Sequence, residues 1–97
     1  MQYVNGMVKD VELVEKNGQK VALITVCNTK QTIWRSGTVS LVSYNTSDIK
    51  VDVTIDQEVG YLEDVVIEVP LSGTGSLDLR FEIQNVQFGP LYSTTIK

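Results

Sequence analysis

Hydrophobic and polar residues alternate along most of this chain. The clearest stretches are Ile49–Asp56 and Leu77–Gln84, in which every second residue is aliphatic or aromatic. Period-two alternation is typical of strands that pack one face on a core and turn the other toward water. No stretch shows the 3.6-residue apolar spacing of an amphipathic helix. The pattern therefore predicts an all-β protein with little or no helix.

A tight hairpin is predicted near the start of the chain. Asn17-Gly18 lies between two strand-like stretches, and Asn-Gly is the strongest two-residue signal for a type I′ turn. Pairing outward from this turn sets Leu13 opposite Ala22 and Val11 opposite Ile24. This register places Val11, Leu13 and Ile24 together on the core face.

The remaining strands follow at short spacing, separated by turn-forming residues. With the hairpin strands, the expected set is Val11–Lys16, Gln19–Cys27, Thr38–Tyr44, Ile49–Ile55, Tyr61–Val69, Ser76–Gln84 and Leu91–Lys97. The turns between the later strands are expected at Ser36-Gly37, Asn45–Asp48, Gly60, Pro70–Gly75 and Gly89-Pro90. About seven short strands in about 100 residues predict an immunoglobulin-like antiparallel β-sandwich, with residues 1–97 as a single domain.

Composition and charge narrow the class of protein. The 97 residues are 42% hydrophobic and 21% charged, which is ordinary for a globular domain. The net charge of −4 argues against nucleic acid, whose phosphates require Lys and Arg. No apolar run approaches the roughly 20 residues of a membrane span. We expect no nucleic-acid partner and no membrane insertion; the compartment stays open, with the cytoplasm slightly favoured over the extracellular space.

The side chains that carry most enzyme chemistry are scarce. There is no histidine, so the commonest general base and zinc ligand are both missing. Cys27 is the single cysteine and adjoins an apolar strand, which favours a buried structural thiol over a nucleophile. The acidic residues fall on predicted solvated faces and spell no Asp-rich calcium loop. We therefore expect no catalytic residue, no metal, no cofactor and no enzyme activity.

A family resemblance begins at Asn28. The segment from Asn28 to Val42 carries Asn28, Trp34, Gly37 and Leu41. It resembles the segment between strands B and C of the four-tryptophan (FW) domain, an immunoglobulin-like module of selective-autophagy cargo receptors with relatives in bacterial extracellular proteins. The similarity continues at Val59-Gly60, Val65–Pro70, Gly75–Ile83, Phe88-Gly89 and Ile96. Ile24, Phe81 and Tyr92 stand where that family has further aromatic positions. The resemblance implies a non-catalytic role in protein–protein contact, including cargo capture.

Four residues are candidates for partner binding. Trp34 is either an exposed anchor or a plug at one end of the sandwich, with its indole N–H bonded to a carbonyl; the plug is favoured. The polar face carrying Asp78, Arg80 and Glu82 is a candidate contact surface. Two other candidates are the loop cluster at Ser36-Gly37 and Val86–Phe88, and a strand edge near Met1–Val8.

Three functions fit these candidates. The leading hypothesis is a protein-interaction module within a larger receptor or adaptor. The second is a structural spacer or accessory immunoglobulin-like domain of an extracellular bacterial protein. Carbohydrate binding ranks lowest, because the exposed aromatics it requires are scattered over different segments of the sequence.

Overall fold

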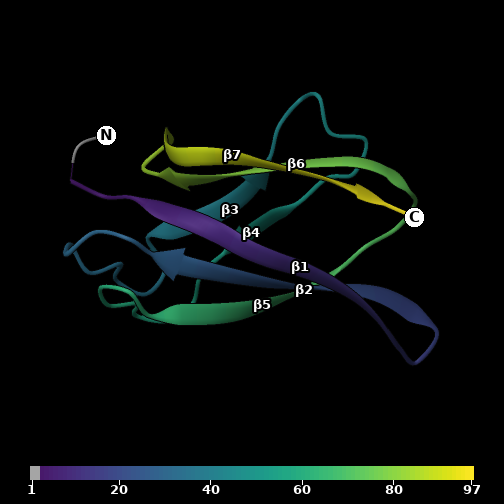
Figure 1. Ribbon diagram of the computed structural model, residues 1–97, viewed down its shortest axis with the longest axis horizontal. Helices are drawn as coiled ribbons and strands as arrows, with labels where there is room; N and C mark the ends of the chain where they lie inside the picture. The colour runs from purple at the N-terminus through teal and green to yellow at the C-terminus, as the bar shows by residue number, and fades with distance from the viewer. Residues whose placement is uncertain (1–2) are drawn as a thin grey trace.

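The alternating stretches form seven strands in two layers (Figure 1). The computed structural model describes residues 3–97. The strands are β1 (Gly6–Lys16), β2 (Gln19–Asn28), β3 (Val39–Ser43), β4 (Asp52–Thr54), β5 (Asp64–Pro70), β6 (Gly75–Ile83) and β7 (Val86–Ile96). One sheet has the order β1-β2-β5 and the other β4-β3-β6-β7, with all neighbours antiparallel. The predicted immunoglobulin-like β-sandwich is confirmed, with the fourth strand paired to the third. Within residues 3–97 no helix is long and apolar enough to cross a membrane.

The first hairpin confirms the predicted register. Asn17 and Gly18 both have positive φ angles, of 53° and 78°, as a type I′ turn requires. Val11 faces Ile24 and Leu13 faces Ala22. The predicted burial of Leu13 is wrong, because this side chain is exposed. Its half of β1 diverges from β7 toward the hairpin tip, so the second sheet does not cover it (Figure 1).

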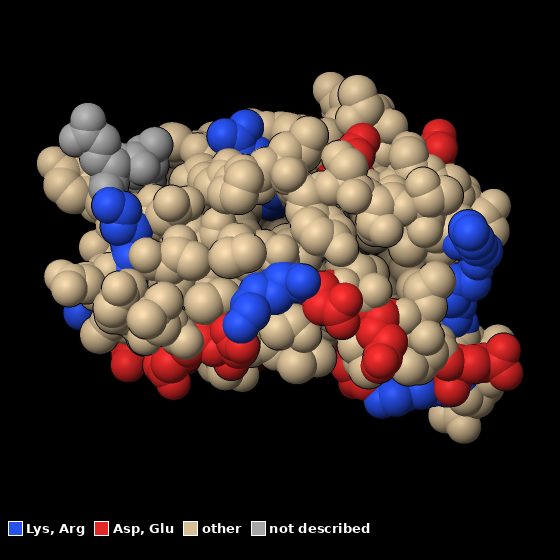
Figure 2. Space-filling model, viewed as in Figure 1, with Lys and Arg blue, Asp and Glu red and all other residues tan. Residues whose placement is uncertain are grey.

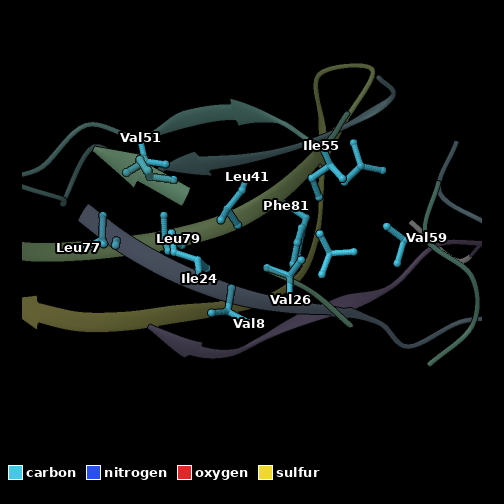
Figure 3. Packing of buried hydrophobic residues seen from close by; sticks show 14 of the residues in the cluster. Val8, Ile24, Val26, Leu41, Val51, Ile55, Val59, Leu77, Leu79 and Phe81 are labelled. Carbon is cyan, nitrogen blue, oxygen red and sulfur yellow. The ribbon is translucent and has the colours of Figure 1, made fainter. Parts of the chain in front are cut away.

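The core lies between the two sheets. The inward positions of β6 are Leu77, Leu79 and Phe81, and each is fully buried. They face Ile24 and Val26 of β2, as the side chains in Figure 3 show. The alternating stretch Ile49–Ile55 also turns its aliphatic face inward, with Val53 only half-buried, although only Asp52–Thr54 pairs as a strand. Alternation therefore predicted which side chains are inside better than it predicted strand length.

The last hairpin differs from the prediction. Gln84-Asn85 forms a two-residue turn with φ angles of 50° and 65°, and β7 starts directly after it at Val86. Val86–Phe88 is therefore strand and not loop, and Gly89-Pro90 is not a turn. Instead, the ladder between β6 and β7 shifts register where Gly89-Pro90 passes Arg80, which makes a bulge. Asn tolerates the left-handed backbone that this turn requires, so no glycine marks it.

Two further expectations concern strand ends. The strand predicted from Tyr61 begins only at Asp64, since residues 60–63 form a turn. The edge predicted near Met1–Val8 is present at Gly6–Val8, which belong to the edge strand β1. Met1 and Gln2 lie outside the described residues.

Candidate functional site

Arg80, a predicted binding residue, is bonded within its own sheet. Its Nε donates to the Gly89 carbonyl at 2.8 Å, and its Nη1 donates to the Tyr44 hydroxyl at 2.7 Å. The Tyr44 hydroxyl in turn donates to Gln87 Oε1 at 2.5 Å. These bonds tie the β7 bulge to β6. Arg80 therefore has a structural role at the bulge, and its binding to a partner stays a prediction.

The other two residues of the predicted β6 face are half-buried. The Asp78 carboxylate accepts a hydrogen bond from the Thr46 hydroxyl at 2.6 Å. Thr46 and then Ser93 hold the pKa of Asp78 below its ordinary value, because hydroxyl donors favour the charged form. Glu82 lies opposite Ser40 of β3 and Gln87 of β7. Binding through Asp78 and Glu82 likewise stays a prediction.

Trp34 closes one end of the core, as the plug hypothesis predicted. Its side chain is buried, and its ring lies 5.2 Å from the Phe81 ring and 6.0 Å from the Phe88 ring between centroids. A Cβ atom on Gly6 would overlap Trp34 Cζ2, so glycine there makes room for the indole. The predicted carbonyl partner is wrong: no acceptor among residues 3–97 bonds Trp34 Nε1. These packing contacts fix the ring and supply no acceptor.

Exposed apolar side chains gather around this plug. We call the end of the sandwich formed by residues 3–5, 29–38, 57–63 and 84–86 the loop end; it lies at the left of Figure 1. Five of the nine exposed large hydrophobic side chains of residues 3–97 belong to it: Tyr3, Ile33, Tyr61, Leu62 and Val86. Exposed apolar groups that cluster in this way are typical of contact surfaces.

Asn28 holds the first loop of this end in place. Its side chain is fully buried, and its amide nitrogen donates to the carbonyls of Thr32 at 2.9 Å and Val59 at 3.0 Å. Its amide oxygen accepts from the Lys30 backbone N–H at 3.0 Å. Trp34 and Val59 exchange two backbone hydrogen bonds of 2.9 Å. The loop that presents Ile33 is therefore fixed by buried polar contacts.

The second loop carries a strained residue. Leu62 has φ of 62°, a left-handed conformation that is rare for a branched side chain, and its side chain is 62% exposed. Its backbone N–H donates to the Asn28 carbonyl at 2.7 Å. The Glu63 carboxylate accepts from the Gly60 N–H at 2.5 Å and closes the turn. These bonds hold Tyr61 and Leu62 outward, and such strain is often found at functional sites.

Two hollows of about 450 Å³ each open at the loop end. The apolar walls of the first are Val4, Ile33, Trp34 and Ile83, with Arg35 at its border. The second is more polar, and its lining residues are Tyr3, Thr29, Lys30, Gln31, Thr32 and Tyr61. Volumes of this size accommodate a small ligand or the anchoring side chains of a peptide.

The loop end also has unpaired positive charge. Within residues 3–97 the ion pairs join Lys9 to Asp64 and Lys16 to Glu68, both on the three-stranded sheet. Lys30 and Arg35 are exposed and form no ion pair with any described residue. The loop end also holds the exposed Glu58 and Glu63, but the charged residues that line the two hollows are Arg35 and Lys30.

Cys27 lies elsewhere, on the outer face of the three-stranded sheet. Its side chain is buried, as predicted, and burial raises the pKa of its thiol, with the neighbouring Asp64 adding to the effect. The pKa of Asp64 is lowered chiefly by its hydrogen bond from Lys9. A thiol held protonated is a poor nucleophile. In the part of the chain that the structure describes, no three His, Cys, Asp or Glu side chains gather as a metal site.

No protein-family model, curated protein or solved structure matches this chain. The candidate site therefore stands on geometry alone. The sequence-based reasoning missed Ile33, Tyr61 and Leu62 as surface residues. The signal available was an apolar residue or pair inside a turn-rich segment, where strand alternation does not apply.

Proposed function

We propose that this chain is a non-catalytic protein-interaction module that contacts its partner through the loop end. The observation that carries the proposal is the exposed apolar cluster on loops that buried hydrogen bonds hold rigid. A rigid surface loses little conformational entropy on binding, so more of the contact energy appears as affinity. Loops on a sandwich are also where immunoglobulin-like domains commonly bind. The resemblance to the FW domain implies the same class of function.

The chemistry of the loop end indicates what kind of protein would bind. The hollow beside Trp34 has apolar walls at Val4, Ile33 and Ile83, which suit an aliphatic or aromatic side chain. Arg35 at its border and Lys30 in the neighbouring hollow attract carboxylates. A segment with one apolar anchor flanked by acidic residues would therefore meet both features.

A spacer role is the second candidate, and the course of the chain favours it. β1 begins at the loop end, and β7 ends at the opposite end of the molecule (Figure 1). The longest Cα dimension is 38 Å, against 26 and 19 Å for the others. The path from Gly6 to Ile96 thus runs along the long axis, as in domains that are joined end to end.

Affinity capture with matched variants tests the proposal. The immobilised chain would be compared with Leu62→Asp, Ile33→Asp and the control Val66→Asp on the outer face of the three-stranded sheet. Leu62 and Val66 are 62% and 59% exposed, so the two substitutions perturb similar surface. Aspartate also tolerates the left-handed backbone at position 62. Thermal melts would establish that all variants are folded.

We expect proteins that the wild type and Val66→Asp capture and that both loop-end variants lose. Capture that survives both loop-end substitutions would move the contact to another surface. Absence of any selective capture would favour the spacer. Retention of oligosaccharides instead of proteins, through the hollow between Tyr3 and Tyr61, would favour carbohydrate binding.

A further inference from the structure

The four sheet edges differ in how they are protected against strand pairing. β1 has a bulge between Val8 and Asp10, and it carries five charged residues: Lys9, Asp10, Glu12, Glu15 and Lys16. β5 carries Asp64, Glu68 and Pro70, and β4 is only three residues long. Charges, bulges, proline and short length are the usual protections of an edge. These three edges are therefore guarded.

β7 is the exception. It has eleven residues and no charge, and its bulge at Gly89-Pro90 leaves Leu91–Ile96 as regular strand beyond it. In Figure 2 the surface over β7 is largely tan, whereas blue and red atoms line the margin over the three-stranded sheet. β1 approaches β7 near Gly89 and then diverges from it (Figure 1). Pro90 and the bulge protect only the first part of β7, and the edge from Leu91 to Ile96 contains no charge, bulge or proline.

The register identifies which backbone groups of this edge are free. Ile83 and Val86 flank a two-residue turn and so form a hydrogen-bonded pair. The hydrogen-bonded pairs recur at every second residue of β6, so we infer that Leu79, Leu77 and Gly75 bond to the residues that face them, Tyr92, Thr94 and Ile96. The intervening residues Leu91, Ser93 and Thr95 therefore direct N–H and C=O groups away from β6. Their side chains are exposed on the outer face.

We propose that a second copy of this chain pairs with this edge, β7 antiparallel to β7, about a twofold axis at Ser93. In this register Ser93 faces Ser93 of the other copy, and Leu91 faces Thr95 in both directions. Three hydrogen-bonded residue pairs follow. The two four-stranded sheets become one continuous sheet.

Self-pairing fits this edge better than a foreign strand does, for two reasons. Every facing pair is uncharged or hydroxyl-bearing, so the register brings no like charges together, although each chain has a net charge of −4. Leu91, Ser93 and Thr95 are also spaced symmetrically about Ser93, so in a twofold pair every free backbone group of one copy meets a free group of the other. Because the other edges are guarded, pairing stops at the dimer and does not continue into a fibre.

Sedimentation equilibrium of the chain from micromolar to millimolar concentration tests this interface. We expect the mass to rise with concentration from 10.8 kDa toward twice that value. In the dimer, the double variant Leu91→Lys with Thr95→Lys places the introduced lysine at position 91 of each copy opposite the one at position 95 of the other copy. In the monomer the two introduced lysines lie four residues apart along one strand and do not face each other. We expect it to raise the dimer Kd about tenfold or more.

The matched control is Leu91→Lys with Thr95→Glu, which changes the same exposed positions and sets opposite charges face to face. We expect it to dimerise at least as well as the wild type. Amide exchange at Leu91, Ser93 and Thr95 is expected to slow as concentration rises. Ile33→Asp at the loop end is expected to leave dimerisation unchanged, which separates this interface from the partner surface.

Three results would overturn the interface. If the chain is still monomeric at millimolar concentration and amide exchange at Ser93 does not slow, no second copy binds this edge. A dimer that is indifferent to the lysine pairs would use another surface. If the two double variants raise the dimer Kd equally, the proposed register is refuted.

Discussion

Asn28→Asp is the sharpest test of how the loop end is built. The substitution keeps the shape of the side chain but replaces the donor nitrogen by oxygen. In the native structure that nitrogen lies 2.9 Å from the Thr32 carbonyl and 3.0 Å from the Val59 carbonyl, and the side chain is fully buried. The introduced carboxylate would face two carbonyl oxygens without compensation.

The magnitude follows from the state of the introduced carboxyl. When charged, it is a buried anion next to two acceptors, and we expect a loss of about 3–5 kcal/mol in the free energy of unfolding. When protonated, its O–H can donate to one carbonyl, which leaves a loss of about 1–2 kcal/mol. The pKa of this carboxyl is therefore raised in the folded state. Its destabilising effect is small below the ordinary carboxyl pKa of about 3.9 and grows as the pH rises above it.

Urea unfolding from pH 4 to pH 7 measures this difference, with each variant compared to wild type at the same pH. Asn28→Ala is the control, because it loses the same hydrogen bonds without adding a charge. We expect it to cost about 2–4 kcal/mol at every pH. A loss below about 1 kcal/mol for Asn28→Asp at pH 7, or a loss that does not change with pH, would refute the role assigned to Asn28.

Four other predictions concern stability and reactivity. Phe81→Ala, which empties a fully buried ring site, is expected to cost about 3–5 kcal/mol in a urea melt; a loss below about 1 kcal/mol would contradict its burial. Leu62→Gly relieves left-handed strain of about 1–2 kcal/mol against a glycine entropy cost of about 0.5–1 kcal/mol, so it should raise stability slightly, whereas Val66→Gly in β5 should lower it. The backbone N–H and the hydroxyl of Ser76 lower the pKa of Asp48. The stabilising effect of the Asp48 carboxylate is therefore present above about pH 3.9 and is lost as the pH falls further, so Asp48→Asn should flatten the acid unfolding curve in that range. Cys27 should react with a thiol reagent far more slowly in the native than in the unfolded chain, and equal rates would show that its thiol is accessible.

Local sequence predicted the features of this fold that depend on local chemistry. Asn17-Gly18 specifies a turn whose geometry fixes the pairing outward from it, and the observed register agrees. Alternation specifies the inward side of β6, and Phe81 is buried there. Leu13 is exposed because its burial depends on how far the second sheet extends over β1. That extent is set by the path of β7, which lies more than seventy residues later in the chain.

The candidate site was harder to predict, because its parts meet only in the folded chain. Ile33 and Leu62 belong to different loops, and each is unremarkable in its own segment. Their loops are held at the same end of the sandwich because Asn28 bonds to Val59 and to the Leu62 backbone at the same time. The role of Arg80 was equally hidden, since its carbonyl partner belongs to a bulge that local sequence indicated only as a turn.

Trp34 connects the closing of the core to the exposure of the site. Burying an indole removes roughly 150–250 Å² from water, which is worth about 4–6 kcal/mol. An unpaired buried N–H costs about 1–3 kcal/mol, so packing against Phe81 and Phe88 outweighs the missing acceptor. The same packing draws residue 34 into the core and forces its neighbour Ile33 outward. The exposure of Ile33 at the loop end is thus a direct consequence of how the core is closed.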